Sequence, residues 1–287
     1  MIETKLSFEK HIVIEVAGQT AISALSENCP QISKQKLKQA MQFGAVWLTP
    51  KFKNNQSDKT SRCRRAKKNL SPADELHLYF DEKILFSDIP PATLIADEGD
   101  YSVWNKPCGM FSQGTKWGDH SSIARWVELF GLEKNNLEKR PTFLVHRLDR
   151  ATSGLIIIAH SKNACRRLAY LFEARKVNKQ YTAKVQGCFP RTSWLLDQDI
   201  DGKNAITQIL SSTYDSVTNH SRLRIKIKTG RKHQIRKHLS ATGYSVQGDR
   251  LYGNVNREVV ADLMLKSCLL EFECPIANEL KSYTLPS

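Results

Sequence analysis

A single carboxylate among basic side chains is the first feature of this sequence that suggests chemistry. In the stretch FLVHRLDRATSGLIIIAH, residues 143–160, Asp149 lies between Arg147 and Arg150. Neighbouring positive charges keep a carboxyl group ionised, and an ionised carboxylate on a turn suits nucleophilic or general-base work such as glycosyl transfer. The same residues also suit a structural role, in which a local ion pair pins a charged turn between two buried strands. The segment alone does not separate these two interpretations.

Two further segments supply side chains that would complement Asp149. The segment RKHQIRKHL, residues 231–239, is expected to form a helix that starts at Gly230, with Arg236 facing inward. A buried arginine needs a carboxylate, and Asp149 is the partner we expect. Tyr181 lies in the predicted strand QYTAKVQG, where its ring would stack on a planar base. The alternatives are a solvated basic helix whose arginines contact phosphates, and a tyrosine that belongs to the core.

The elements that position these residues indicate an α+β fold with a mixed, largely antiparallel sheet, because strands and helices do not alternate as regular βαβ units. The segment RLRIKIK, residues 222–228, alternates strictly between apolar and cationic residues, so one whole face of this strand is positively charged. Such a face indicates a binding surface. The other predicted elements are strands at 101–107, 142–148 and 154–160, a helix at 121–131 that ends at Gly131, and an amphipathic helix at 161–176.

Composition favours a nucleic-acid partner. The 287 residues include 43 Lys and Arg against 29 Asp and Glu, which gives a net charge of +14. A surplus of this size favours a polyanion, with nucleic acid first and an anionic membrane second. We expect no membrane span, since no apolar run approaches the roughly 18 residues required. Seven scattered cysteines without CxxC spacing predict neither disulfides nor a metal site, and suit a reducing cytoplasm.

The first eighty residues read as a small basic unit. The segment ISKQKLKQAMQFGAVWL, residues 32–48, predicts a helix with Ser33 as N-cap and Gly44 as its stop, followed by a strand. Residues 51–68 carry eight basic side chains against one acid, Asp58, and are either a solvated loop or a nucleic-acid contact. With the later LSPADELHLYF, these segments resemble an S4-type RNA-binding domain, whose pattern a polar insertion at 49–61 interrupts. Its expected RNA contacts are Lys34, Lys38, Arg64, Arg65, Lys67 and Lys68.

The proline-containing acidic segment 87–100 marks a boundary. We therefore expect a small α/β S4-like domain at residues 1–85 and a catalytic domain at residues 92–287. From about residue 100 to 275 the chain resembles the RluA-type pseudouridine synthases. The matching segments are HRLDRATSGLIIIA, VWNKPCGMFSQG, KQYTAKVQG, GKNAIT, TGRKHQIRKHLSATGYSVQGDRLYG and LLEFECP.

The resemblance implies a role for each of the residues singled out above. Asp149 would be the catalytic aspartate, Tyr181 the tyrosine that stacks on the target uracil or acts as base, and Arg236 the arginine paired with Asp149. Arg147 would fill the place of the flipped nucleotide, and Arg231 and Lys232 would contact RNA. This family isomerises uridine in RNA to pseudouridine without cofactor or metal. The sequence leaves open whether Asp149 attacks the sugar, attacks the base or removes a proton.

Three hypotheses for function follow. An RNA pseudouridine synthase is favoured, because the Asp149, Tyr181 and Arg236 set is complete, and ribosomal RNA is favoured over transfer RNA as its substrate. A catalytically silent RNA-binding or ribosome-assembly protein would be expected to lose one of the three. A DNA-binding or hydrolytic enzyme lacks supporting spacing. The chain departs from the family pattern at Cys108 and at 266–267, where lysine and serine stand. We expect a monomer without an obligate protein partner.

Overall fold

The computed structural model describes residues 6–51, 59–190, 193–253 and 262–286. The chain forms two compact units: unit 1 comprises Met1–Ile89 with Gln113–Trp126, and unit 2 comprises Pro90–Ser112 with Val127–Ser287. The first division, after residue 89, falls within the expected linker. The segment 113–126 differs from expectation, because it packs with the N-terminal residues although its sequence neighbours belong to unit 2.

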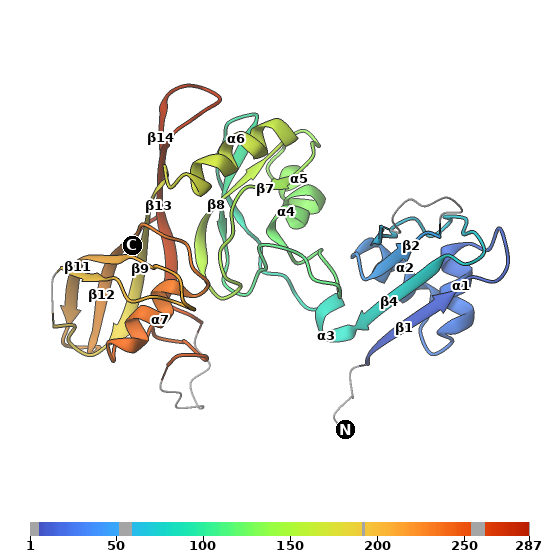
Figure 1. Cartoon of the computed structure of the whole chain (residues 1–287), viewed down its shortest axis with the longest axis horizontal. Helices are drawn as coiled ribbons and strands as arrows, with labels where there is room; N and C mark the ends of the chain where they lie inside the picture. Colours follow the sequence, from blue (N-terminus) through green and yellow to red (C-terminus); the bar gives the residue numbers. More distant parts are fainter. Residues whose placement is uncertain (1–5, 52–58, 191–192, 254–261, 287) are drawn as a thin grey trace. The chain divides into compact units, whose positions relative to one another are not determined.

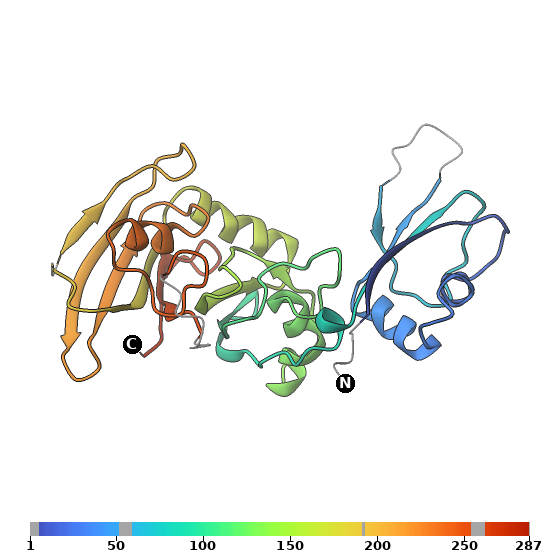
Figure 2. The same ribbon diagram turned by 90° about the horizontal axis from the view of Figure 1, so that it is seen from below.

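Unit 1 is a four-stranded antiparallel sheet in the order β1-β4-β2-β3 with two helices beside it (Figures 1 and 2). Ser33 caps the second helix by accepting from the Lys36 amide, and Gly44 follows its end at a φ of +79°, as predicted. The elements are β1 (Ser7–Val13), α1 (Ala21–Asn28), α2 (Lys34–Gln42), β2 (Val46–Thr49), β3 (Ser61–Arg62), β4 (Glu75–Asp81), α3 (Glu82–Leu85) and α4 (Ile123–Trp126).

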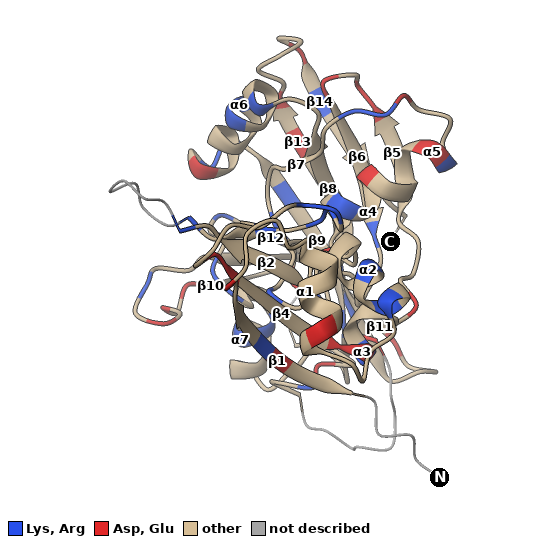
Figure 3. Cartoon of the chain, turned by 90° about the vertical axis from the view of Figure 1, so that its right-hand side faces the viewer, with Lys and Arg blue, Asp and Glu red and all other residues tan. Residues whose placement is uncertain are grey.

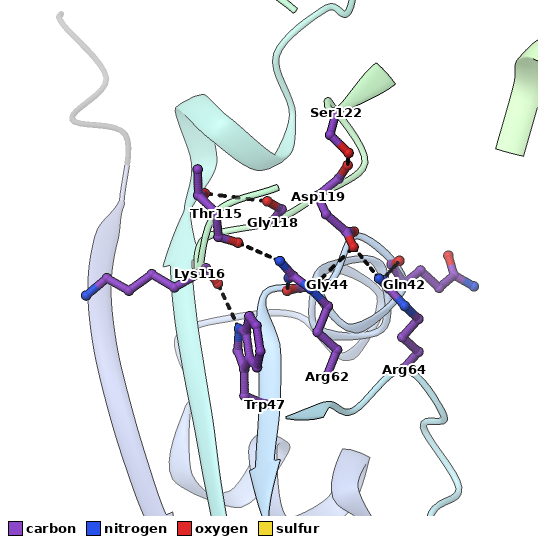
Figure 4. A network of polar contacts seen from close by, with 10 residues as sticks. All are labelled: Gln42, Gly44, Trp47, Arg62, Arg64, Thr115, Lys116, Gly118, Asp119 and Ser122. Carbon is purple, nitrogen blue, oxygen red and sulfur yellow. Dashed lines mark hydrogen bonds and ion pairs between the residues drawn. The ribbon is translucent and has the colours of Figure 1, made fainter. Parts of the chain in front are cut away.

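Two arginines of the basic run hold the segment 113–126 within unit 1 (Figure 4). Asp119 accepts a hydrogen bond from Arg64, and the Arg62 Nε lies 3.3 Å from the same carboxylate oxygen. Arg62 also donates to the backbone carbonyls of Gly44 and Thr115. The φ of +79° at residue 44 favours glycine, and a Cβ there would lie 2.6 Å from the Asp119 carboxylate and would displace these side chains.

Unit 2 is built on a mixed, largely antiparallel sheet, which confirms the predicted architecture. Its main path runs β10-β11-β12-β9-β13-β8-β6-β5, with β14 on β13 and β7 on β8 (Figure 1). Among the described strands, the one parallel pairing joins β13 to β8. The strands are β5 (Thr93–Asp97), β6 (Tyr101–Lys106), β7 (Phe143–Leu144), β8 (Ser153–Ala159), β9 (Asn178–Gln186), β10 (Trp194–Leu196), β11 (Thr207–Asp215), β12 (His220–Ile227), β13 (Leu265–Glu273) and β14 (Leu280–Thr284).

The helices of unit 2 differ from the predicted ones at their ends. The helix expected to stop at Gly131 continues through a wide π-type turn, η1 (Val127–Gly131), into α5 (Leu132–Lys134). α6 (Lys162–Glu173) begins after its N-cap Ser161 and packs on β8. α7 (Gln234–Ala241) begins four residues later than expected, because His233 adopts a left-handed conformation at φ +55° and cannot continue a helix.

The core of unit 2 lies under β8, where Leu155, Ile156, Ile157, Ile158 and Ala159 are all fully buried. A strand buried on both faces reads as a continuous apolar run, which is what the sequence carries here. Cys268 and Cys274 are buried packing residues on or beside β13, as expected. Among the described residues, no helix is long and apolar enough to cross a membrane.

Candidate active site

Three distant segments of unit 2 meet around one cavity of about 260 Å³. The loop after β7 contributes Arg147 and Asp149, β9 contributes Tyr181, and the start of α7 contributes Arg236. Arg231 and Lys232 also line this cavity. The structure therefore brings together six of the twelve candidate residues, including the three proposed for catalysis.

The loop that carries Asp149 is held by a second loop, residues 106–112. The Ser112 hydroxyl donates to the Leu148 carbonyl at 2.6 Å and accepts from the Leu148 amide at 3.0 Å. Arg150 is bonded in the same way, since its carbonyl accepts from the Gly109 amide and its Nε donates back to the Gly109 carbonyl. Residues on both sides of Asp149 are thus fixed, which limits the freedom of its carboxylate.

Lys106 contributes to this support from inside the unit. Its side chain is fully buried, and its ammonium donates to the carbonyls of Pro107, Met110 and Arg150. Burial lowers the pKa of Lys106 to about 8, while the Asp149 charge partly opposes this shift. A buried ammonium that reaches three carbonyls fixes the two loops relative to each other.

His146 supports the loop that carries Asp149 and does not line the cavity. Its Nε2 accepts a hydrogen bond from the Ile157 amide, and its ring stacks on Phe172 with centroids 4.2 Å apart. Burial, reinforced by the charge of Lys179, lowers the pKa of His146 to about 3. The imidazole is therefore neutral at neutral pH, as its acceptor role requires.

Gly154 allows the loop to enter β8 beside β13. A Cβ at this position would lie 2.2 Å from the Ser267 carbonyl oxygen, closer than atoms can approach. The parallel pairing of Ser267 with Gly154 therefore depends on the absent side chain. Thr152 closes the preceding turn through its amide, which donates to the Asp149 carbonyl.

Tyr181 points into the cavity from β9 and is 8% exposed. Burial, followed by the negative charge of Asp149, raises the pKa of Tyr181 well above its ordinary value. The phenol is thus protonated at neutral pH. This favours the stacking role that the resemblance implies over the role of a resting base.

Arg236 faces inward as predicted, but its partner is not Asp149. Its Nε and Nη2 donate to the two carboxylate oxygens of Asp249 at 2.8 and 2.7 Å, and both side chains are nearly inaccessible. Burial alone would raise the pKa of Asp249, yet bonds from Arg236 and from the amides of Leu251 and Tyr252 leave it lowered. The expected Arg236–Asp149 ion pair was wrong because a nearer carboxylate, 13 residues along the chain, satisfies the guanidinium bidentately.

His233 lines the cavity and carried no assignment from the sequence. Its Nε2 lies 3.9 Å from Asp149 Oδ1, and its Nδ1 lies 2.9 Å from the Tyr252 hydroxyl. The Tyr252 ring in turn lies 5.1 Å from the Arg236 guanidinium. The left-handed backbone at His233 directs the imidazole ring into the cavity, and a run of basic residues in the sequence does not indicate that conformation.

The other six candidate residues lie in unit 1. Lys34 and Lys38 are exposed on α2, and Arg65, Lys67 and Lys68 are exposed after β3. Arg64 is only 29% exposed and is engaged by Asp119 and by the Gln42 carbonyl, so its charge serves the fold. Lys53 and Asp58 of the basic run lie outside the described residues.

Known proteins share sequence and fold with a large part of this chain. The model of the RNA pseudouridylate synthase family matches residues 100–241. The ribosomal large subunit pseudouridine synthase D of Borreliella burgdorferi is 32% identical over 228 residues, which cover 70% of this chain and 68% of the relative. The chain belongs to the RNA pseudouridine synthase family. It is therefore an isomerase that converts uridine in RNA to pseudouridine.

This pseudouridine synthase is also similar to the dual-specificity RNA pseudouridine synthase RluA of Escherichia coli, at 28% identity over 214 residues. That match covers 69% of this chain and 94% of the relative. The solved structure of human RNA pseudouridylate synthase domain containing 1 has a TM-score of 0.57 at 22% identity, and covers 70% of this chain and 85% of that one. The likeness to the human protein concerns the fold alone. The S4-like character of unit 1 stays a prediction.

Proposed function

We propose that Asp149 is the catalytic carboxylate of this pseudouridine synthase and that large-subunit ribosomal RNA is its substrate. The observation that supports the first part is the convergence of Asp149, Tyr181, Arg147 and Arg236 on one cavity from three segments of the chain. A cavity of about 260 Å³ is at the small end of ligand sites and suits one base rather than a stretch of helix.

The target uridine must leave its stack before it can enter this cavity, at a cost of a few kcal/mol. Arg147 is exposed at the rim, where its guanidinium can contact phosphate and fill the vacated place in the stack. Inside, the protonated ring of Tyr181 provides a flat apolar surface for the uracil. Tyr181 and Arg147 therefore bind and orient the base, while Asp149 acts on it.

The reaction breaks the bond from the sugar C1′ to N1 of uracil and forms a bond from C1′ to C5. The C5 proton is released and N1 takes up a proton, so the isomerisation balances and no oxidant or cofactor is needed. Asp149 assists as an ionised carboxylate by attacking the sugar, attacking the base or removing a proton. Arg236, which is held by Asp249, lines the same cavity and places a positive charge on its wall.

Two observations support ribosomal RNA as the substrate. The Borreliella relative is named for the large ribosomal subunit. Unit 1 also presents a row of exposed cations on α2 and after β3, which suits a second contact with a large structured RNA. Mapping pseudouridines across ribosomal and transfer RNA in cells with and without the protein tests this part. Lost sites in transfer RNA alone would contradict it.

Asp149→Asn tests the catalytic part, because it removes the charge and keeps the shape. Pseudouridine formation should fall by at least about 10³-fold, as for removal of a catalytic carboxylate elsewhere, while the dissociation constant for RNA is unchanged. Release of tritium from RNA labelled at C5 of uridine measures the reaction. Asp201→Asn, at an exposed acid paired with Lys237, is the matched control and should retain activity. Substantial product from Asp149→Asn would remove Asp149 from its role.

A further inference from the structure

A second cavity of about 260 Å³ lies on the other face of β9 from the active-site cavity. Successive side chains of a strand point to opposite faces, so Tyr181 faces the active-site cavity whereas Thr182 and Lys184 face the second one. Leu265, at the start of β13, borders both cavities. The proposed function assigns nothing to this second cavity.

Three cations on neighbouring strands surround the second cavity: Lys184 on β9, Arg222 on β12 and Lys266 on β13. Arg222 lies directly opposite Lys184 in the antiparallel register, and Lys266 lies opposite Thr182. Like charges opposite each other on paired strands destabilise a sheet. The three residues, called here the basic sheet face, are therefore costly to the fold unless an anion neutralises them.

The described surroundings supply no acid that does so. None of the residues that line the cavity is Asp or Glu. Within the part of the chain that the structure describes, neither Lys184 nor Arg222 forms an ion pair with a carboxylate, although Lys184 acts at longer range on exposed Asp215. Lys266 donates to the Pro286 carbonyl, which leaves its charge uncompensated.

The chemistry of the lining selects phosphate oxygens. The hydroxyls of Ser153 and Thr182 lie among the three cations, and lysine, arginine, serine and threonine are the side chains that hold phosphate groups of nucleic acids. The cationic row also continues along β12 through Arg224 and Lys226, whose side chains lie on the same face. A continuing row suits an extended strand of phosphodiesters better than a single small ion.

We propose that the basic sheet face binds the phosphodiester backbone of the substrate RNA away from the target nucleotide. This site would add affinity and fix the RNA on the enzyme without taking part in the reaction. The proposal requires RNA as the substrate, which the family supplies, and is independent of the role given to Asp149.

The test removes the three charges together in Lys184→Gln/Arg222→Gln/Lys266→Gln. The matched control, Lys139→Gln/Lys162→Gln/Arg166→Gln, removes three exposed cations elsewhere in unit 2, two of them on α6, whose cationic turns are visible in Figure 3. Binding of an in vitro transcript of large-subunit ribosomal RNA is measured over a range of salt concentrations. The triple variant should lose roughly 2 from the slope of log affinity against log salt, and the control should lose less.

Kinetics separate this proposal from the proposed function. The triple variant should raise KM and leave kcat at saturating RNA unchanged, whereas Asp149→Asn should abolish kcat and leave binding unchanged. An unchanged salt slope in the triple variant, or an equal loss in the control, overturns the proposal. Inorganic phosphate at constant ionic strength is the second probe. If phosphate binds to the basic sheet face while the triple variant binds RNA as tightly as the wild type, the site takes a free anion. That result also overturns the proposal.

Two measurements guard against misfolding of the triple variant. Because repulsion is relieved, its melting temperature without RNA should equal or exceed that of the wild type, and a clear decrease contradicts the repulsion argument. A photoreactive p-benzoylphenylalanine in place of Met264 leaves every charge intact. Met264 is 46% exposed at the cavity, so irradiation should crosslink it to the transcript, and absence of a crosslink overturns the proposal.

Discussion

The two units use their basic residues in different ways. In unit 1, Arg62 and Arg64 come from the basic run yet both contact Asp119 and hold the segment 113–126. In unit 2, Arg147 and Lys232 at the active-site cavity, like Lys184 and Arg222 at the second cavity, form no ion pair with any described carboxylate. A run of positive charge in the sequence therefore does not identify a nucleic-acid contact. A cationic side chain without a carboxylate partner in the folded structure is a better indicator of such a contact.

The largest expected effect concerns the paired arginine of unit 2. Asp249→Ala leaves Arg236 buried without a carboxylate, and the free energy of unfolding should fall by about 3–5 kcal/mol. Urea denaturation followed by circular dichroism measures this change. The matched control, Asp201→Ala, breaks an ion pair at the surface and should change stability far less, because water and salt screen exposed charges. Equal effects of the two variants would show that burial does not set the strength of these pairs.

A smaller effect is expected in unit 1. Asp119→Ala leaves Arg62 and Arg64 without their carboxylate, but these side chains are 17% and 29% exposed and can partly regain water. The free energy of local opening should fall by about 1–3 kcal/mol in unit 1 and not in unit 2. Hydrogen exchange of the β2 and β4 amides, compared with those of β8, measures this difference. Unchanged protection of β2 would mean that Arg62 and Arg64 do not stabilise the unit.

The smallest effect concerns His146, a neutral imidazole that supports the loop carrying Asp149. The folded pKa of His146, about 3, lies below its ordinary value near 6.5, so only the unfolded chain takes up this proton between those values. Stability should therefore fall as pH decreases from about 6.5 towards 3. His146→Gln removes the titration, and its melting temperature should fall less steeply over this range. The difference from wild type at pH 7.5 reports the packing change alone, and parallel pH curves would contradict the assignment.

The sequence predicted the mixed sheet of unit 2 and named six of the residues that line the candidate active-site cavity. The periodicity of 222–228 and the apolar run at 155–159 became β12 and β8, because burial patterns follow directly from residue type. The partner of Arg236 was not predictable in this way. The sequence contains both Asp149 and Asp249 as possible partners, and only the path of the folded chain decides which carboxylate reaches the guanidinium of Arg236.

Two other features also required three-dimensional information. His233 lines the candidate active-site cavity because of its left-handed backbone, which neither charge nor hydropathy indicates. The placement of 113–126 depends on contacts with Arg62, Arg64 and Trp47, whose indole donates to the Lys116 carbonyl (Figure 4). Contacts between segments 55 to 69 residues apart leave no local pattern in a sequence. For this reason the expected boundary at residues 85–92 did not include the returning segment.

The return of residues 113–126 to unit 1 has a consequence for biosynthesis. Domains usually fold in order from the N-terminus as they leave the ribosome, at about 5–20 residues per second. Here β4 is complete at residue 81, yet Asp119 and its neighbours must emerge before Arg62 and Arg64 acquire their carboxylate. These two arginines therefore lack their carboxylate for about a few seconds, until a piece of chain is translated after unit 2 has begun. Until then, Arg62 and Arg64 carry unmatched positive charge while the nascent N-terminal residues are still beside the ribosome.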